Sequence, residues 1–191
     1  RWSADVPISV ARLGKDAAPS PVPDTAWNAW APGADPANAW VCAQGMWVGR
    51  SGSLWVIDPA SPGFAGVVEG GAKLVEIDPR TNAVLRVIRF DAAAAPPRSY
   101  LNDVRVDDAT STAYLTDSGL GALVVVDLAT GTARRVLDGH PSTQSEGLVL
   151  RFDGQELRMP DGSLPHVHAD GIALDPDGSR RWWHVLTGRA L

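Results

Sequence analysis

Three polar side chains stand at the starts of similar apolar segments and could together bind a ligand. They are Gln44, Asn102 and Asp170, and each is followed within two residues by a run typical of a β-strand. If the three strands converge, their carboxamide and carboxylate oxygens could bind a calcium-like divalent cation or the polar head group of a small molecule. The alternative is that each side chain caps backbone N–H groups at its strand start, as Asn and Asp do readily.

Two further carboxylates could act as general bases at the same place. Asp103 follows Asn102, and Asp117 ends the next apolar segment. A carboxylate in a half-buried, negatively charged pocket mouth can take a proton from a substrate. The competing interpretation is turn chemistry, because aspartate recurs at strand ends in this chain, for example at Asp58. The predicted ligand-binding set is therefore Gln44, Asn102, Asp103, Asp117 and Asp170.

A histidine pair lies just before Asp170, the third of the polar residues that precede an apolar segment. His166 and His168 alternate along an extended segment, so both imidazoles and the carboxylate of Asp170 would share one face. Two imidazoles and a carboxylate can hold zinc or another transition metal. Same-side residues on a strand are about 6.6 Å apart, so a shared ion requires the strand to bend, and a polar loop without a metal is the alternative.

The chain has eight tryptophans, which are many for 191 residues. Four of them fall on expected strands, where they would fill the space between sheets: Trp47, Trp55, Trp182 and Trp183. Trp27, Trp30 and Trp40 fall in expected loops and could instead wall a pocket for an aromatic ligand.

The elements that must position these residues are short strands. Fifteen prolines and nineteen glycines interrupt the sequence every few residues, which favours an all-β protein over helices. Residues 73–78 align with 122–127, and each segment is followed by a turn containing Thr and by another strand pattern, at 83–88 and 132–137. Each unit is thus predicted to be a four-stranded antiparallel meander of roughly fifty residues, the size of a β-propeller blade.

The repeats predict a single partial β-propeller domain over residues 1–191. Its parts are a remnant of blade one at about 1–39, blade two at about 40–92, blade three at about 98–140 with an inserted hairpin at 141–165, and the start of blade four at 166–191. An ending inside a blade predicts a fragment of a longer chain. The two long insertions, residues 59–71 and 141–165, should lie on one face of the propeller, and a binding face often carries such loops.

The composition of the chain argues against several classes of partner and linkage. The net charge is −5, the positive charge is spread along the chain, and the sequence pI is near 5.3, so nucleic acid is not an expected partner. The single cysteine, Cys42, excludes an internal disulfide. No apolar run reaches about 18 residues, so no membrane span is expected. Residues 1–5 are expected to be neither a signal peptide nor a natural start, because no Met begins them. The oligomeric state is left open.

One series of motifs resembles the yellow / major royal jelly protein family. The series consists of Leu101-Asn102-Asp103, Tyr114-Leu115-Thr116-Asp117-Ser118-Gly119 and His140-Pro141-Ser142, with support from Gln44-Gly45 and from residues 170–178. It is most similar to the bacterial, dopachrome-tautomerase-related branch. The resemblance implies a six-bladed β-propeller, of which this chain covers three to four blades, and a secreted or periplasmic location.

The resemblance also suggests chemistry. Members of the family include amine binders, pigment-pathway proteins and storage proteins. The more distant gluconolactonase-like propellers hold a divalent cation at the channel mouth, and Asn102 and Asp170 are similar to two of the cation-binding positions.

Three hypotheses follow, and whether the protein is an enzyme is left open. The first is a propeller that binds a small polar or aromatic ligand at the channel mouth. The second is an enzyme, either a cation-dependent lactonase-like hydrolase or a dopachrome-tautomerase-like enzyme. The third is a structural or interaction propeller without chemistry.

Overall fold

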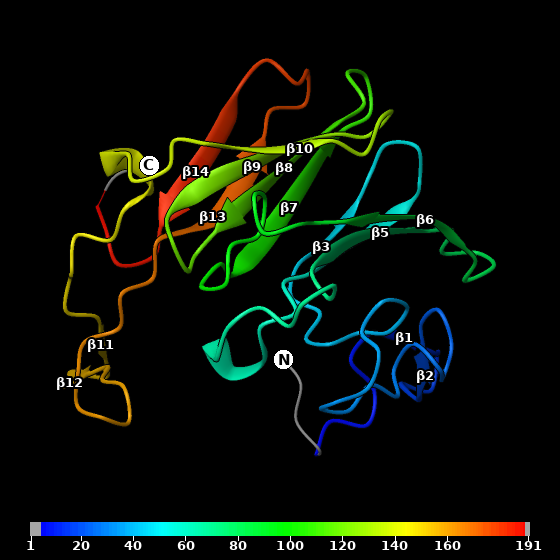
Figure 1. The fold of residues 1–191 in the computed structure, drawn as a ribbon, viewed down its shortest axis with the longest axis horizontal. Helices are drawn as coiled ribbons and strands as arrows, with labels where there is room; N and C mark the ends of the chain where they lie inside the picture. Colours follow the sequence, from blue (N-terminus) through cyan, green and yellow to red (C-terminus); the bar gives the residue numbers. More distant parts are fainter. Residues whose placement is uncertain (1–4, 190–191) are drawn as a thin grey trace.

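The computed structural model describes residues 5–189 as an all-β chain with two four-stranded antiparallel sheets (Figure 1). Each sheet is a meander in which consecutive strands pair, as the repeats predicted. The first sheet consists of β3 (Met46–Val48), β4 (Leu54–Asp58), β5 (Lys73–Ile77) and β6 (Val84–Arg89). The second consists of β7 (Leu101–Asp107), β8 (Thr112–Asp117), β9 (Ala122–Asp127) and β10 (Ala133–Val136).

The turns between the third and fourth strands of the two sheets are built in the same way. After β5, the carboxylate of Asp78 accepts a hydrogen bond from the backbone N–H of Arg80 at 2.8 Å. After β9, Asp127 accepts from Ala129 at 2.8 Å. An aspartate that binds the backbone two residues later fixes a tight turn, so the aligned sequences give aligned strands.

The inner strands of successive units lie side by side. Strand β7 contacts β3 on one side and β13 (Ala169–Leu174) on the other (Figure 1). The approach is close at Gly45, where an added Cβ would lie 2.5 Å from the carbonyl oxygen of Asn102. Glycine is therefore required beside the polar opener Gln44, because any side chain would push the two sheets apart.

Two apolar clusters hold the units together. Alternate residues of the first sheet face opposite ways, so Trp55 and Ile57 pack toward the second sheet while Val56 packs toward the N-terminal segment. Trp27 and Trp40 belong to the N-terminal cluster and are 8% and 0% exposed.

Two predictions about the tryptophans, one on pocket walls and one on packing between sheets, are wrong for some of these residues. Trp27, Trp30 and Trp40 are core residues, so they do not wall a pocket, because the loops that carry them fold against the first sheet. Of the four predicted packing residues, Trp55 is buried, but Trp182 on β14 (Arg181–Val185) is 41% exposed.

The remaining strands form three small sheets. Strand β13 pairs with β14 at the predicted start of the fourth unit. The predicted hairpin within residues 141–165 is present but shorter than its pattern, with β11 (Arg151–Phe152) against β12 (Gln155–Glu156). Near the N-terminus, β1 (Ala11–Leu13) pairs with β2 (Pro19–Pro21), and residues 22–45 contain no strand. Two short 3-10 helices are η1 (Pro62–Phe64) and η2 (Pro141–Thr143).

Among residues 5–189, no helix has the length and apolar character that a membrane span requires.

Candidate functional site

A cavity of about 390 Å³ lies at the end of the sheets where β7 and β13 begin. Both insertions reach it: η1 belongs to the loop after β4, and the β11–β12 hairpin belongs to the segment before β13, and the two project from the same side of the sheets (Figure 1). The lining residues are Ser61, Phe64, Arg98, Ser99, Tyr100, Ser118, Gly119, Met159, Leu164, Pro165, His166 and Val167. A cavity of this volume suits a small organic molecule.

An aromatic pair forms one wall of this cavity. The rings of Phe64 and Tyr100 are stacked, with centroids 4.1 Å apart and planes inclined by 25°. Phe64 remains 65% exposed, so Tyr100 covers only part of its surface. Its backbone φ is +63°, a left-handed conformation that costs a bulky residue about 1–3 kcal/mol. The residue that presents an exposed aromatic ring at the cavity is thus also one with an unfavourable backbone conformation.

The hydroxyl of Tyr100 connects the cavity to the predicted polar residues. It donates to Oε1 of Gln44 at 2.8 Å. Nδ2 of Asn102 donates to the carboxylate of Asp170. The structure therefore brings Asn102 and Asp170 together and places Gln44 against the back of the aromatic wall. None of the three is a lining residue among the described part of the chain.

A β-bulge sits at two of the three polar openers. The register of β7 on β8 shifts between Leu101 and Val104, and the register of β13 on β14 shifts between Ala169 and Ile172. Simple alternation therefore fails at Asn102, which lies inside the first bulge.

Asp170 is a half-buried carboxylate in an unfavourable setting. Burial raises the pKa of the Asp170 carboxyl, and the nearby charge of Asp103 adds to the effect, while the hydrogen bond from Asn102 opposes it. The carboxylate form is thus destabilised where two bulged strands meet.

Asp117 is buried behind the cavity and supports its wall. It is 0% exposed, and its oxygens accept hydrogen bonds from the backbone of Tyr100, Gly119 and Leu120, from the hydroxyl of Ser99 and from Arg135. The Arg135 guanidinium lies 2.7 Å from the carboxylate. Five hydrogen bonds thus engage the Asp117 carboxylate in holding the cavity wall, and its role as a general base stays a prediction.

The first sheet repeats this arrangement at Asp58. The carboxylate accepts from the backbone of Val41 and Cys42 and pairs with Lys73 at 3.2 Å, with both charged side chains fully buried. Burial lowers the pKa of Lys73, and Asp58 opposes that shift. Asp58 and Asp117 thus occupy equivalent positions in the two sheets, and each is buried and paired with a cation. This repetition indicates that an aspartate at this position stabilises the sheet.

The single cysteine is unsuited to nucleophilic chemistry. Burial, and then the charge of Asp58, raises the pKa of the Cys42 thiol to about 12. Its sulfur accepts a hydrogen bond from the backbone N–H of Ser61. A buried thiol of this kind is inert.

Asp103 is held by a neighbouring cation. Its carboxylate lies 2.9 Å from the Arg105 guanidinium, which also stacks over the ring of Trp47 at 4.7 Å. The second candidate general base is thus engaged in an ion pair on the inner strand.

The predicted histidine pair meets at one serine. Nδ1 of His168 accepts from the backbone N–H of Ser145 at 3.0 Å, and Nδ1 of His166 lies 3.3 Å from the Ser145 hydroxyl. Burial lowers the pKa of His168, and the neighbouring His166 lowers it further against the opposing charge of Asp117. His166 is exposed and lines the cavity, so it is the imidazole that a ligand would meet.

The described residues do not by themselves complete a cation site. Within residues 5–189, no three His, Cys, Asp or Glu side chains are grouped so as to hold a metal ion. Calcium takes six to eight oxygen ligands, and near the strand openers Asp170 is the one carboxylate not held in an ion pair with Arg105 or Arg135. The predicted metal ligands Asn102, Asp170, His166 and His168 therefore stay predictions.

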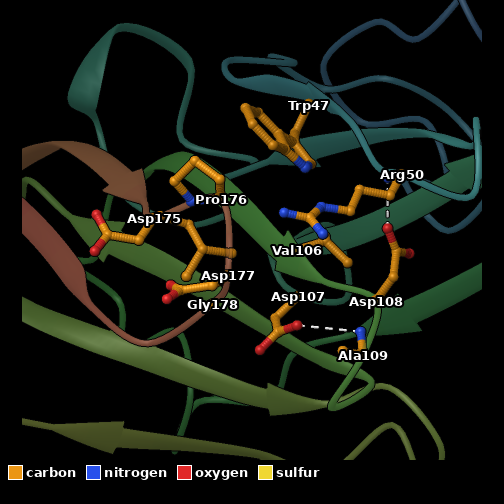
Figure 2. Close-up of a pocket in the computed structure, with 11 residues that line it drawn as sticks. Trp47, Arg50, Val106, Asp107, Asp108, Ala109, Asp175, Pro176, Asp177 and Gly178 are labelled. Carbon is orange, nitrogen blue, oxygen red and sulfur yellow. Dashed lines mark hydrogen bonds between the residues drawn. The ribbon is translucent and has the colours of Figure 1, made fainter.

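A smaller, acidic cavity of about 90 Å³ lies at the opposite ends of the inner strands (Figure 2). Its acidic lining residues are Asp107, Asp108, Asp175 and Asp177. Asp108 accepts from the backbone N–H of Arg50 at 2.5 Å, and Asp107 accepts from that of Ala109 at 3.1 Å, so these carboxylates shape turns. The backbone and side chain of Ser179 lower the pKa of Asp177, as in an ordinary Asx turn.

Sequence reasoning missed the residues that line the larger cavity. Phe64, Arg98 and Tyr100 were not among the predicted ligand contacts, although the two insertions that reach the cavity were expected on a binding face. For Phe64 the available signal was the insertion that carries it, since a loop added to a repeating unit is spared from core packing.

Comparisons with known proteins identify a family. The family model for "Major royal jelly protein" matches residues 41–186. No curated protein matches the chain in sequence. A solved structure, described as a candidate 6-phosphogluconolactonase from Bacteroides uniformis ATCC 8492, is similar over 92% of this chain at 13% identity, with a TM-score of 0.40. The chain spans 56% of that structure's length.

Proposed function

The chain belongs to the major royal jelly protein family, and on that premise we propose that it binds a small aromatic or polar ligand beside the mouth of a β-propeller channel. The observation that carries the proposal is the exposed ring of Phe64, which stacks on Tyr100 at the cavity and is carried on a left-handed backbone. A ligand ring could stack on the uncovered surface of Phe64, and such aromatic contacts contribute about 0.5–1.5 kcal/mol beyond area burial.

The rest of the cavity supports binding of an aromatic molecule. The segment between β12 and β13 contributes four apolar side chains to the lining, those of Met159, Leu164, Pro165 and Val167. Mostly apolar walls with a few polar groups are the usual design of small-molecule sites. Among the described lining residues there is one imidazole and no carboxylate, which favours binding over cation-assisted hydrolysis.

The proposal extends to the whole protein. It includes a ring of six blades, a secreted or periplasmic location and kinship with the bacterial, dopachrome-tautomerase-related branch. In such a ring Gln44, Asn102 and Asp170 would face the axis behind Tyr100, where further blades could add oxygen ligands for a cation.

The test is ligand-observed NMR with the neutral probe 4-hydroxybenzyl alcohol. Phe64→Ala should weaken binding about three- to tenfold, because it removes the stacking surface. Phe152→Ala is the matched control, since Phe152 is 80% exposed on β11 and does not line the cavity. Equal losses in both variants, or no binding by the unmodified protein, would contradict the proposal.

A further inference from the structure

Among residues 5–189, the charged side chains that line the cavity carry positive charge and no negative charge. Of its described lining residues, Arg98 is the one with a permanent charge, and none is Asp or Glu. This contrasts with a chain whose net charge is −5. A local excess of positive charge in an acidic protein repels cationic ligands and attracts anionic ones.

The carboxylate nearest the wall does not offset this charge. Asp117 lies directly behind Ser99 and Tyr100, but it is fully buried and paired with Arg135 at 2.7 Å. Its remaining oxygen sites are occupied by backbone N–H groups.

The guanidinium of Arg98 is available to a ligand. Arg98 is exposed, and its guanidinium has no hydrogen-bond or ion-pair partner within residues 5–189. Arg135, by contrast, bridges Asp117 and Asp138. An unpaired guanidinium on a flexible stem can close on a planar carboxylate through two parallel hydrogen bonds.

The hydroxyls of three other lining residues already donate hydrogen bonds within the protein. The hydroxyl of Ser99 donates to Asp117, that of Ser118 donates to the carbonyl of Ala169, and that of Tyr100 donates to Gln44. These hydroxyls therefore do not compete with Arg98 for an anionic group.

We propose that the cavity selects an aromatic acid, with the ring on Phe64 and the carboxylate on Arg98, over the corresponding aromatic amine. The inference rests on the proposed function and names its ligand class. A single guanidinium can bind one carboxylate through two parallel hydrogen bonds. An ammonium group would meet the same guanidinium as a like charge.

The experiment compares three probes of equal ring size by isothermal titration: 4-hydroxybenzoate, tyramine and neutral 4-hydroxybenzyl alcohol. The acid should bind about tenfold more tightly than the amine, with the alcohol between them. Arg98→Met should weaken the acid about tenfold and leave the alcohol within about twofold, because a charge-assisted contact is lost. Arg134→Met is the matched control, since Arg134 is exposed and does not line the cavity.

The outcomes separate this inference from the proposed function. If the alcohol binds but the acid binds no better than the amine, or if Arg98→Met leaves the acid unchanged, the selectivity inference is overturned and the binding function stands. If none of the three probes binds, both fail.

Discussion

Asp117→Asn tests whether the buried acid behind the cavity belongs to the fold. The substitution keeps the side-chain shape and one oxygen for the backbone N–H groups of Tyr100, Gly119 and Leu120, all of which bind Oδ1. It removes the negative charge and turns an N–H group toward the guanidinium of Arg135, where a donor would face a donor.

The magnitude follows from the burial of the pair. Asp117 is 0% and the Arg135 side chain 8% exposed, and removing one partner of a buried pair typically costs about 3–5 kcal/mol. Arg135 retains Asp138, which is itself 56% exposed and solvated. We therefore expect a loss near the lower limit, about 3 kcal/mol in the free energy of unfolding.

The assay is urea unfolding followed by tryptophan fluorescence. Asp138→Asn serves as control and should cost at most about 1 kcal/mol, as for other exposed ion pairs. The double variant Asp117→Asn/Arg135→Met should recover part of the loss, because it removes the unpaired cation. A cost for Asp117→Asn no larger than that for Asp138→Asn would refute the argument.

Three further predictions concern the residues around the cavity. The raised pKa of Asp170 means that the folded protein binds more protons than the unfolded chain just above about pH 4, so ionisation of this group costs stability as pH rises. Asp170→Asn should therefore gain stability relative to the unmodified protein from acid to neutral pH, and parallel pH profiles in urea titrations would count against the burial argument. The lowered pKa of His168 has the opposite sign: stability should fall as pH drops below about 6.5, where the unfolded chain takes up a proton first. Thermal melts of His168→Gln should show a flatter profile, and an unchanged one would be inconsistent with a buried neutral imidazole. Gly119→Ala places a Cβ against the backbone of Arg98 and should lower the melting temperature and ligand affinity together, whereas Gly171→Ala, which has open space around it, should change neither.

The strands could be predicted because their signals are local and repeated. Residues 73–77 and 122–127 form the third strands of the two sheets, and Asp78 and Asp127 fix the same turn after each. A pattern that occurs twice with the same spacing specifies a unit even without knowledge of its neighbours.

The cavity could not be predicted because irregular loops build it. The left-handed backbone of Phe64 and its stacking on Tyr100 depend on contacts between residues far apart in sequence. The bulge that contains Asn102 also breaks the alternation from which its direction was inferred.

The partners in the buried ion pairs also could not be predicted from the sequence. Equivalent aspartates, Asp58 and Asp117, find their cations on different strands, with Lys73 at the start of β5 and Arg135 on β10. The repeat therefore identified the acid positions but gave no guide to their partners.

The central claim is that an aromatic ligand occupies the cavity between the two insertions. Its most direct test is a map of amide chemical-shift changes when 4-hydroxybenzoate is added to the isotopically labelled protein. We expect changes at residues 61–66, 98–100, 118–119 and 166–167, which surround the cavity. Changes confined to residues 107–109 and 175–178, around the acidic cavity at the other end of the sheets, would contradict it.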